Sequence, residues 1–318
     1  AWNAGEYGYT VNHYQQNVDG SDKYTLVNSV HLTAPMDSEV EAVINSYEGF
    51  TSPESQLVIT IGVDETKNVV DYYYTRNQYS LAWNLSGGEA EGYTEGMVYY
   101  GAAVTIPEPV KYGYSYVWDK TPKVNMPAEN VEYTAVWTAN SYTVTLDPAG
   151  GALDAGEDAV KTVVFDAPYG KLPMPVRKGY HFDGWFTQPQ TSDKAGLSAA
   201  EDALVKLAYD HTVYAHYTPI EYKITYNNID GALNANPGSY DVTTERVELA
   251  APVRTGFTFK GWYDNKELTG EAVTVISTAG MRDMELYAKW SENSYKVVYH
   301  SNNGGDVTNE ESFTYTES

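Results

Sequence analysis

Six histidines are the side chains best suited to metal binding or proton transfer in this chain, and their spacing favours neither. They are His13, His31, His181, His211, His216 and His300. No pair has the helical spacing of a zinc site, and His211 and His216 only flank a predicted strand. The chain has no cysteine, which excludes disulfides and thiolate metal sites. We therefore predict no metal ion and no cofactor.

The common catalytic patterns are missing as well. The sequence contains no Gly-x-Ser-x-Gly, no His-Glu-x-x-His and no phosphate-binding loop. Carboxylates are plentiful, but no pairing recurs that would support a glycosidase dyad. Residues 17–22 (NVDGSD) resemble part of a calcium loop, yet the distal glutamate is missing, and Asp19-Gly20 favours a hairpin turn within 9–27. We predict that this region is not an enzyme.

Tyrosine is the residue type in greatest excess, with 30 in the chain. Exposed tyrosine makes good contacts with sugars and proteins, although it is also common on the solvent faces of sheets. In DYYYT (71–75) the three rings cannot all be buried, because neighbours in a strand point to opposite faces. In YGYSY (112–116) three rings could stack on one face. The candidate binding residues are Tyr72, Tyr73, Tyr74, Tyr112, Tyr114 and Tyr116.

The net charge of the chain is −23, from 43 acidic and 20 basic residues. This charge argues against binding to nucleic acid or to anionic lipid, and it fits an exported protein. No apolar run approaches the length of a membrane span, and no signal peptide begins the sequence. Because the chain starts with Ala1 and not with Met, we expect it to be part of a longer protein.

One phrase occurs repeatedly. LPMPVRKGYHFDGWF (172–186) and LAAPVRTGFTFKGWY (249–263) are identical at eight of fifteen positions. A looser copy, IPEPVKYGYSYVWDK (106–120), lacks the glycine before its tryptophan, so that Trp118 comes one residue early. A ligand site need not recur in every copy, whereas a core must. We therefore predict that the repeated residues form module cores: Trp118, Trp137, Gly179, Phe182, Trp185, Gly256, Phe259, Trp262 and Trp290.

The glycines of this phrase predict specific backbone geometry. Gly179 and Gly256 stand at a strand entry, where a positive φ is expected. A glycine before Trp185 and Trp262 permits a bulge that turns the indole toward the core. Truncating such a tryptophan should cost about 3–5 kcal/mol.

Each copy of the phrase belongs to a longer frame. An aromatic strand with a glycine-rich turn opens the frame, and a strand ending in an aromatic residue closes it. About two residues separate one frame from the next, which suggests docked modules and not beads on a flexible linker. The predicted segments are 1–7 (the end of a preceding repeat), 8–76, 77–139, 140–219, 220–291 and 292–318 (the start of a further repeat).

The elements expected in these modules are mostly short strands. The best helix signal is SAAEDALVKLA (198–208), where Ser198 and Glu201 form a capping box and four apolar residues share one helical face. The fold class predicted is therefore β-rich α+β, with tandem small modules in an elongated array.

The frame SYTVTLDPAGG … VRKGYHFDGWF … TVYAHY resembles the internalin B repeat, also called the Listeria–Bacteroides repeat. Residues 220–291 resemble it equally, and 77–139 resembles a divergent copy. Residues 8–76 are similar to the mucin-binding-protein-like repeats. The resemblance implies β-grasp-like modules in large extracellular proteins of Gram-positive and gut bacteria, and it brings no catalytic residues.

The repeats, short joints, acidity, missing catalytic motifs and surplus tyrosine, together with this resemblance, leave three functions open. The first is a non-catalytic stalk and adhesion region at the bacterial cell surface, which presents a distal domain, contacts host surfaces, and is anchored outside the present residues. The second is a specific module that binds mucin glycans or a host protein through exposed tyrosines. The third is an accessory array of a large secreted enzyme whose catalytic domain lies elsewhere. Neighbouring modules of the same chain are expected partners; nucleic acid and membrane insertion are not.

Overall fold

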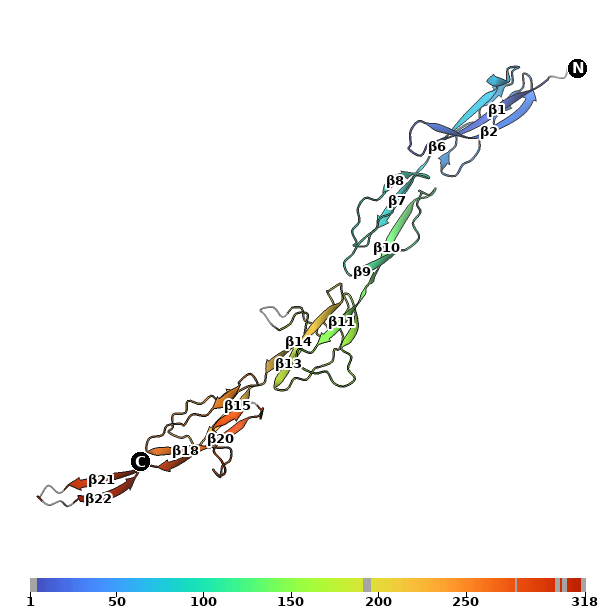
Figure 1. The fold of residues 1–318 in the computed structure, drawn as a ribbon. Helices are drawn as coiled ribbons and strands as arrows, with labels where there is room; N and C mark the ends of the chain where they lie inside the picture. Colours follow the sequence, from blue (N-terminus) through green and yellow to red (C-terminus); the bar gives the residue numbers. More distant parts are fainter. Residues whose placement is uncertain (1–4, 191–195, 278, 301–303, 305–307, 316–318) are drawn as a thin grey trace. The chain divides into compact units, whose positions relative to one another are not determined.

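The computed structural model describes residues 5–190, 196–277, 279–300, 304 and 308–315 (Figure 1). The predicted end of a preceding repeat therefore lies mostly outside the described residues. The chain separates into two compact units, the first formed by residues 1–141 with 206–208 and the second by 142–205 with 209–318.

Strands make up nearly all of the regular structure. In the first unit they are β1 (Glu6–Gln16), β2 (Tyr24–Pro35), β3 (Glu39–Glu41), β4 (Phe50–Thr51), β5 (Val58–Thr60), β6 (Val69–Arg76), β7 (Gln78–Asn84), β8 (Gly96–Tyr99), β9 (Tyr114–Trp118) and β10 (Val131–Ala139), with the 3-10 helix η1 (Glu65–Lys67) before β6. The boundary between the two units falls at the first residue of β11. The strands of the second unit are β11 (Ser141–Asp147), β12 (Val160–Val164), β13 (Tyr180–Phe186), β14 (His211–Pro219), β15 (Tyr222–Asn227), β16 (Ser239–Tyr240), β17 (Arg246–Glu248), β18 (Phe257–Tyr263), β19 (Val275–Ser277), β20 (Met284–Glu292), β21 (Ser294–His300) and β22 (Thr308–Thr314).

Four sheets have the same strand order. Their orders are β2-β1-β6-β4, β8-β7-β10-β9, β12-β11-β14-β13 and β16-β15-β20-β18. In each sheet the two central strands are the ones that come first and last in the sequence, and they pair in parallel. One edge strand lies on each side of this pair. We call these sets the first to fourth modules. The strands of each module come from one of the segments 8–76, 77–139, 140–219 and 220–291, allowing one or two residues at the ends.

The predicted helix at 198–208 is wrong, and the α+β class is corrected to an almost entirely β class. No α-helix occurs among the residues that the structure describes. The backbone of this segment bonds to a neighbouring loop: Val205 N donates to Ala167 O, and Tyr169 N donates to Ala203 O. These hydrogen bonds join two segments of the same chain, and Val205 is completely buried between them. In a helix the same backbone groups would have bonded to each other. Local capping signals therefore lose to tertiary pairing.

A bulge precedes the core tryptophan in the third and fourth modules, as the sequence predicts. The register of β13 against β14 shifts between Phe182 and Gly184, and that of β18 against β20 shifts between Phe259 and Gly261. The two glycines have φ angles of 140° and 135°. Each bulge lets the next side chain, Trp185 or Trp262, turn into the core.

The second module reaches the same pairing without a bulge. Trp118 lies opposite Ala135, as Trp185 lies opposite Ala215 and Trp262 opposite Ala288. β9 has one residue between Tyr116 and Trp118, whereas β13 has two between Phe182 and Trp185, and this extra residue is the one by which the register shifts. Trp118 therefore comes one residue early in the sequence but keeps its cross-strand partner.

The residue that follows each closing strand makes one recurring hydrogen bond to a glycine of its own module. Gly49, Gly113, Gly179 and Gly256 have φ angles of 77°, 81°, 83° and 79°, which confirms the positive φ predicted for Gly179 and Gly256. The carbonyls of these glycines accept hydrogen bonds at 2.8–2.9 Å from the backbone N–H groups that follow the closing strands, those of Asn77, Asn140, Ile220 and Asn293.

Two of the joints that follow a closing strand match in detail, one in each unit. In the first, Tyr100 N donates to Asn77 O, Thr51 Oγ1 donates to Asn77 Oδ1, and the Tyr100 ring packs edge-on against Phe50. In the second, Tyr315, Asn293, Thr258 and Phe257 make the same contacts. At both places the linker asparagine is therefore hydrogen-bonded on its two sides, through its N–H and through its carbonyl.

Candidate binding surface

The three tyrosines of β6 divide between the two faces of the first sheet. Tyr72 and Tyr74 are 1% and 0% exposed, whereas Tyr73 is 50% exposed. The Tyr72 hydroxyl donates to Ala42 O at 2.8 Å, and the Tyr74 hydroxyl accepts from Asn45 N at 2.9 Å. Both rings are part of the core, so the predicted contact role is corrected for these two residues. Only Tyr73 can meet a partner.

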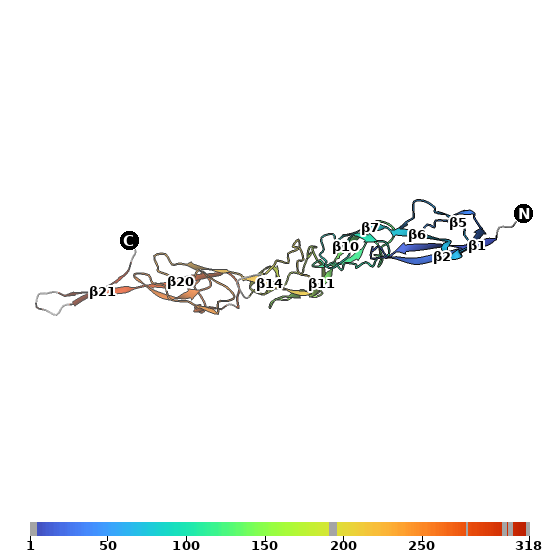
Figure 2. The same cartoon turned by 90° about the horizontal axis from the view of Figure 1, so that it is seen from above.

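Tyr73 belongs to a group of three rings on the outer face of the first module. It stacks on Tyr14 with ring centroids 5.1 Å apart and an interplanar angle of 16°, and Tyr24 packs edge-on against it at 5.1 Å. The rings come from β6, β1 and β2, three strands that lie side by side (Figures 1 and 2). We call Tyr14, Tyr24 and Tyr73 the outer aromatic cluster.

Polar groups border this cluster on the same face. Asn12 Nδ2 donates to Asp71 Oδ1 at 2.9 Å, and Ser29 Oγ donates to Asn12 Oδ1 at 2.7 Å. Asp71 and Tyr73 also line a shallow cavity of about 280 Å³ with the loop at 53–57. Burial raises the pKa of Tyr14, and the Asp71 carboxylate raises it further, so its hydroxyl stays protonated near neutral pH. Stacked rings beside amide and carboxylate groups are suited to binding a sugar.

The second predicted tyrosine group is arranged differently from the expectation. Tyr112 lies in the turn before β9 and is 64% exposed. Tyr114 and Tyr116 are half-buried on β9; Tyr116 packs against Trp118 and Trp137, and Lys111 lies 4.8 Å from the Tyr114 ring centroid. Of the three rings, Tyr112 is therefore the exposed one, and Tyr114 and Tyr116 are partly covered.

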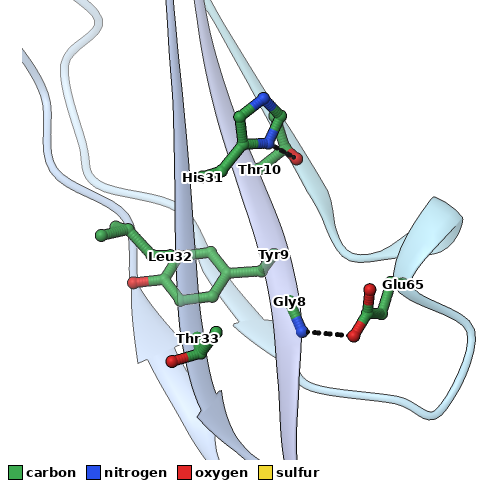
Figure 3. Close-up of a pocket in the computed structure, with 7 residues that line it drawn as sticks. All are labelled: Gly8, Tyr9, Thr10, His31, Leu32, Thr33 and Glu65. Carbon is green, nitrogen blue, oxygen red and sulfur yellow. Dashed lines mark hydrogen bonds between the residues drawn. The ribbon is translucent and has the colours of Figure 1, made fainter.

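A polar hollow of about 470 Å³ lies over β1 and β2 near η1 (Figure 3). Glu65 Oε1 accepts a hydrogen bond from Gly8 N at 2.8 Å, and His31 Nδ1 lies 2.9 Å from Thr10 Oγ1. Thr33, Leu32 and Tyr9 complete the lining. The hollow is open and holds one carboxylate, and it contains no triad or paired carboxylates that would indicate catalysis.

His13 is buried beneath this region, at 1% exposure. Its Nδ1 lies 2.8 Å from the Tyr74 hydroxyl, and its ring stacks on Tyr72 with centroids 5.8 Å apart. Burial lowers the pKa of His13, because the charged imidazolium would lose its hydration there. The neutral ring is therefore a structural part of the core.

This burial predicts that acid destabilises the first module. The unfolded chain binds the His13 proton near its ordinary pKa of about 6.5, whereas the folded module binds it only at lower pH. Stability should therefore fall as the pH drops below about 6.5. Intrinsic-rate-corrected hydrogen exchange of peptides from β1 would measure this. His13→Gln should flatten the pH dependence, and exposed His31→Gln should leave it; an unchanged profile in His13→Gln would contradict the prediction.

Histidines elsewhere make structural contacts. His216 Nε2 lies 2.8 Å from Gln188 O, and its ring stacks on Phe186. His211 Nε2 lies 2.8 Å from the Tyr169 hydroxyl. Within the described part of the chain no three His, Asp or Glu side chains gather as metal ligands.

The residues predicted for module cores lie in or against the cores. Trp185 and Trp262 are 4% and 1% exposed. Phe182, Phe259, Trp290 and Trp118 are partly buried against the hydrophobic clusters, and Trp137 is half-buried with its Nε1 donating to Leu85 O. Gly179 and Gly256 are buried before β13 and β18. Both have a positive φ, and their carbonyls accept hydrogen bonds from Ile220 N and Asn293 N.

Sequence reasoning missed Tyr14 and Tyr24 as members of the exposed cluster. Adjacent or alternating tyrosines suggested the predicted binding residues, and Tyr14 and Tyr24 are isolated in the sequence. The alternation of β1 (YTVNHY, 9–14) held a signal, because it places Tyr14 on the face opposite Tyr9, Val11 and His13. Their meeting depends on the parallel register of β1 and β6, which one sequence does not reveal.

The third and fourth modules share their strand order, the bulge before the tryptophan and the positive-φ glycine. Both also match one family in sequence. Residues 142–216 and 222–289 match the Listeria-Bacteroides repeat domain. These two repeat domains carry the bulged Gly-Trp strand and the positive-φ joint glycine described above.

Several proteins are similar to a larger part of the chain. A "Putative Gly-rich membrane protein" of Evansella cellulosilytica is 28% identical over 93% of this chain and 33% of its own length. A "Putative membrane protein" of the same organism is 26% identical over 75% of this chain and 36% of its own length. Internalin H of Listeria monocytogenes is 30% identical over 60% of this chain and 35% of its own length. The chain thus spans about a third of these relatives.

Proposed function

We propose that this chain is a non-catalytic repeat region of an extracellular bacterial surface protein, in which docked modules present a distal domain and contribute to adhesion. The observations that carry the proposal are the hydrogen bond from a linker N–H to a positive-φ glycine of the same module, repeated at four successive places, and the bonds of Tyr100 and Tyr315 to Asn77 O and Asn293 O, one within each unit. Ordered connections of this kind suit a structure that holds another domain away from the cell. Similarity to Internalin H and to membrane proteins, and the excess of acidic residues, support the surface location.

The module type is a further part of this proposal. A central parallel pair with antiparallel neighbours supports a β-grasp-like relationship, in which irregular segments replace the helix. No helix in the described residues is long and apolar enough to cross a membrane.

Hydrogen exchange of the intact chain tests whether the connections between modules are hydrogen-bonded in solution. The amides of Tyr100 and Tyr315 donate to Asn77 O and Asn293 O from the segment that follows each linker, so they should exchange at least a hundredfold more slowly than the amides of an unstructured chain. Exchange at the random-coil rate at both amides would contradict docked joints and would favour independent modules on flexible linkers.

The outer aromatic cluster favours a second function, the binding of mucin-type glycans or of a host protein. Tyr73 offers an exposed ring supported by Tyr14 and Tyr24, with Asp71 and Asn12 beside it. This arrangement gives a stacking face and hydrogen-bonding groups at one place on the first module.

A glycan array separates this second function from a spacer role. Tyr73→Ala should weaken saturable binding of the full chain about fivefold, while Tyr112→Ala, which removes another exposed ring, should leave it unchanged. Loss of one stacking ring typically removes about 1 kcal/mol, which corresponds to about a fivefold change in affinity. Equal binding by both variants would remove the cluster from consideration, and no binding by the folded wild-type chain would favour the spacer.

A further inference from the structure

The strand β2 leaves one long edge of the first sheet open. Of its twelve residues, all pair with β1 except at one bulge, and no other described strand pairs with its far side. The corresponding edge strands of the other modules, β8, β12 and β16, have four, five and two residues. Short edge strands are a common protection against unwanted pairing, and β2 lacks that protection.

The chemistry of β2 adds to its accessibility. The sequence YTLVNSVHLTAP contains no Asp, Glu, Lys or Arg, and its proline is the last residue. The pairing of Asn28 to Pro35 with β1 is regular, because the bulge lies at Val27. Eight residues of uncharged, regular edge are therefore available for pairing.

The ladder with β1 shows which groups face outward. Thr10 N donates to Asn68 O, and Gly8 N donates to Glu65, so these residues of β1 direct their N–H groups away from β2. Their opposite residues, His31 and Thr33, are consequently non-hydrogen-bonded partners of β1. The N–H and C=O groups of Ser29, His31 and Thr33 therefore point outward, ready to pair with another strand.

An apolar groove runs beside this edge on the inner face. A cavity of about 220 Å³ is lined by Val11, His13, Val30, Leu32, Val43 and Asn45. Leu32 and Val43 are 42% and 62% exposed. Every second side chain of an added strand would point into this groove, because side chains alternate along a strand.

The first module is acidic, and one carboxylate lies directly at this edge: Glu6 Oε2 accepts a hydrogen bond from Thr33 Oγ1. Glu65 bonds to Gly8 N on the side of β1 away from β2, and it lines the same hollow as His31 and Thr33. Residues 5–76 contain 11 Asp and Glu against Lys23, Lys67 and Arg76, and Lys67 pairs with Asp64. The remaining side chains of an added strand would meet this field, which favours cationic groups.

We propose that residues 28–35 of β2 bind an extended segment of a partner protein by strand addition, and that this segment alternates apolar with basic residues. Its backbone pairs with Ser29, His31 and Thr33, its apolar side chains enter the groove beside Val30 and Leu32, and its basic side chains face the acidic outer surface. A second copy of this chain is a poor occupant, because each copy carries a net charge of −23. The geometry does not depend on whether the repeats form an adhesive region.

A peptide titration with the full chain tests strand addition. The probe is an acetylated and amidated (Lys-Val)4 peptide, with (Glu-Val)4 as the charge control. We expect saturable binding of the lysine peptide with at least tenfold weaker binding of the glutamate peptide. Equal affinity for the two peptides, or no binding of the lysine peptide, would overturn the proposal.

Backbone methylation separates strand pairing from simple charge attraction. Two versions of the lysine peptide carry N-methyl groups on all lysines or on all valines. An added strand points only every second N–H at its neighbour, so one version should lose at least tenfold in affinity and the other should not. Which version fails gives the strand orientation. Equal effects of the two methylation patterns would show that the backbone is not recognised.

Variants of the chain locate the site. Val43→Asn should weaken binding at least fivefold, and Val63→Asn, a valine of similar exposure outside the groove, should leave it unchanged. His31→Pro removes an outward N–H, and His31→Thr keeps it. If His31→Pro disturbs folding, the valine pair still decides the outcome. A concentration-dependent dimer abolished by His31→Pro would make a second copy the occupant and would overturn the proposal of a partner.

Discussion

Replacing Gly49 by alanine should loosen the joint between the first and second modules and cost more stability than a comparable glycine elsewhere. An alanine Cβ at Gly49 would lie 2.2 Å from the Tyr100 ring, and the φ angle of 77° is unfavourable for any residue with a Cβ. Gly92 has a φ angle of 70° and nothing within 4 Å of an added Cβ. Gly92→Ala therefore isolates the backbone strain, which is about 1–2 kcal/mol.

The difference between the two variants measures the contact of the joint. We expect Gly49→Ala to lose a further ~1 kcal/mol, which is the order of an aromatic packing contact. Exchange of the Asn77 and Tyr100 amides should accelerate only in this variant, because both take part in the joint. A double variant with Tyr100→Ala should abolish the extra loss. If the Gly49 and Gly92 variants behave alike in both measurements, Tyr100 does not dock on Gly49.

Trp262→Ala should be the most damaging single substitution in the fourth module. The side chain is 1% exposed, packs against Phe259 and Tyr226, and donates from Nε1 to Ala250 O at 3.1 Å. Truncating a buried tryptophan costs about 3–5 kcal/mol, which is comparable to the whole stability of a small module.

Calorimetry of the intact chain would measure this loss as the melting of one module at a lower temperature. Val253→Ala, at a residue that is 67% exposed, should change stability by less than about 0.5 kcal/mol. Trp290→Ala should cause an intermediate loss of stability. The Trp290 ring is only half-buried, and it makes one hydrogen bond, from Nε1 to Asn228 O. A melting profile for Trp262→Ala that matches the wild type would show that the indole is not the anchor of the core.

Much of the module plan could be predicted from the sequence because it depends on local chemistry. The Asp19-Gly20 turn predicts the β1–β2 hairpin, and the structure confirms it. The bulge before Trp185 and the alternation of Tyr72, Tyr73 and Tyr74 are equally local. Spacing alone could show that these rings alternate between two faces, but not which face is buried.

The features that could not be predicted depend on which segments meet in space. The segment 198–208 has a capping box, but the loop at 166–170 supplies its hydrogen-bond partners. The joint role of Gly256 requires its carbonyl to meet Asn293, 37 positions later in the sequence. The outer aromatic cluster requires β1 and β6 to pair in parallel. Similarity of the first module to mucin-binding-like repeats stays a prediction.

The absent bulge of the second module has a consequence for how such repeats diverge. A bulge adds one residue to a strand, but the residues before and after the bulge keep their partners on the neighbouring strand. One codon can therefore be gained or lost before the tryptophan, and Trp118 still meets Ala135. Any other single-residue deletion within β9 would invert the faces of the residues beyond it. Repeat copies that differ in length at this position therefore keep the same cross-strand pair, and an alignment gap there does not indicate a different fold.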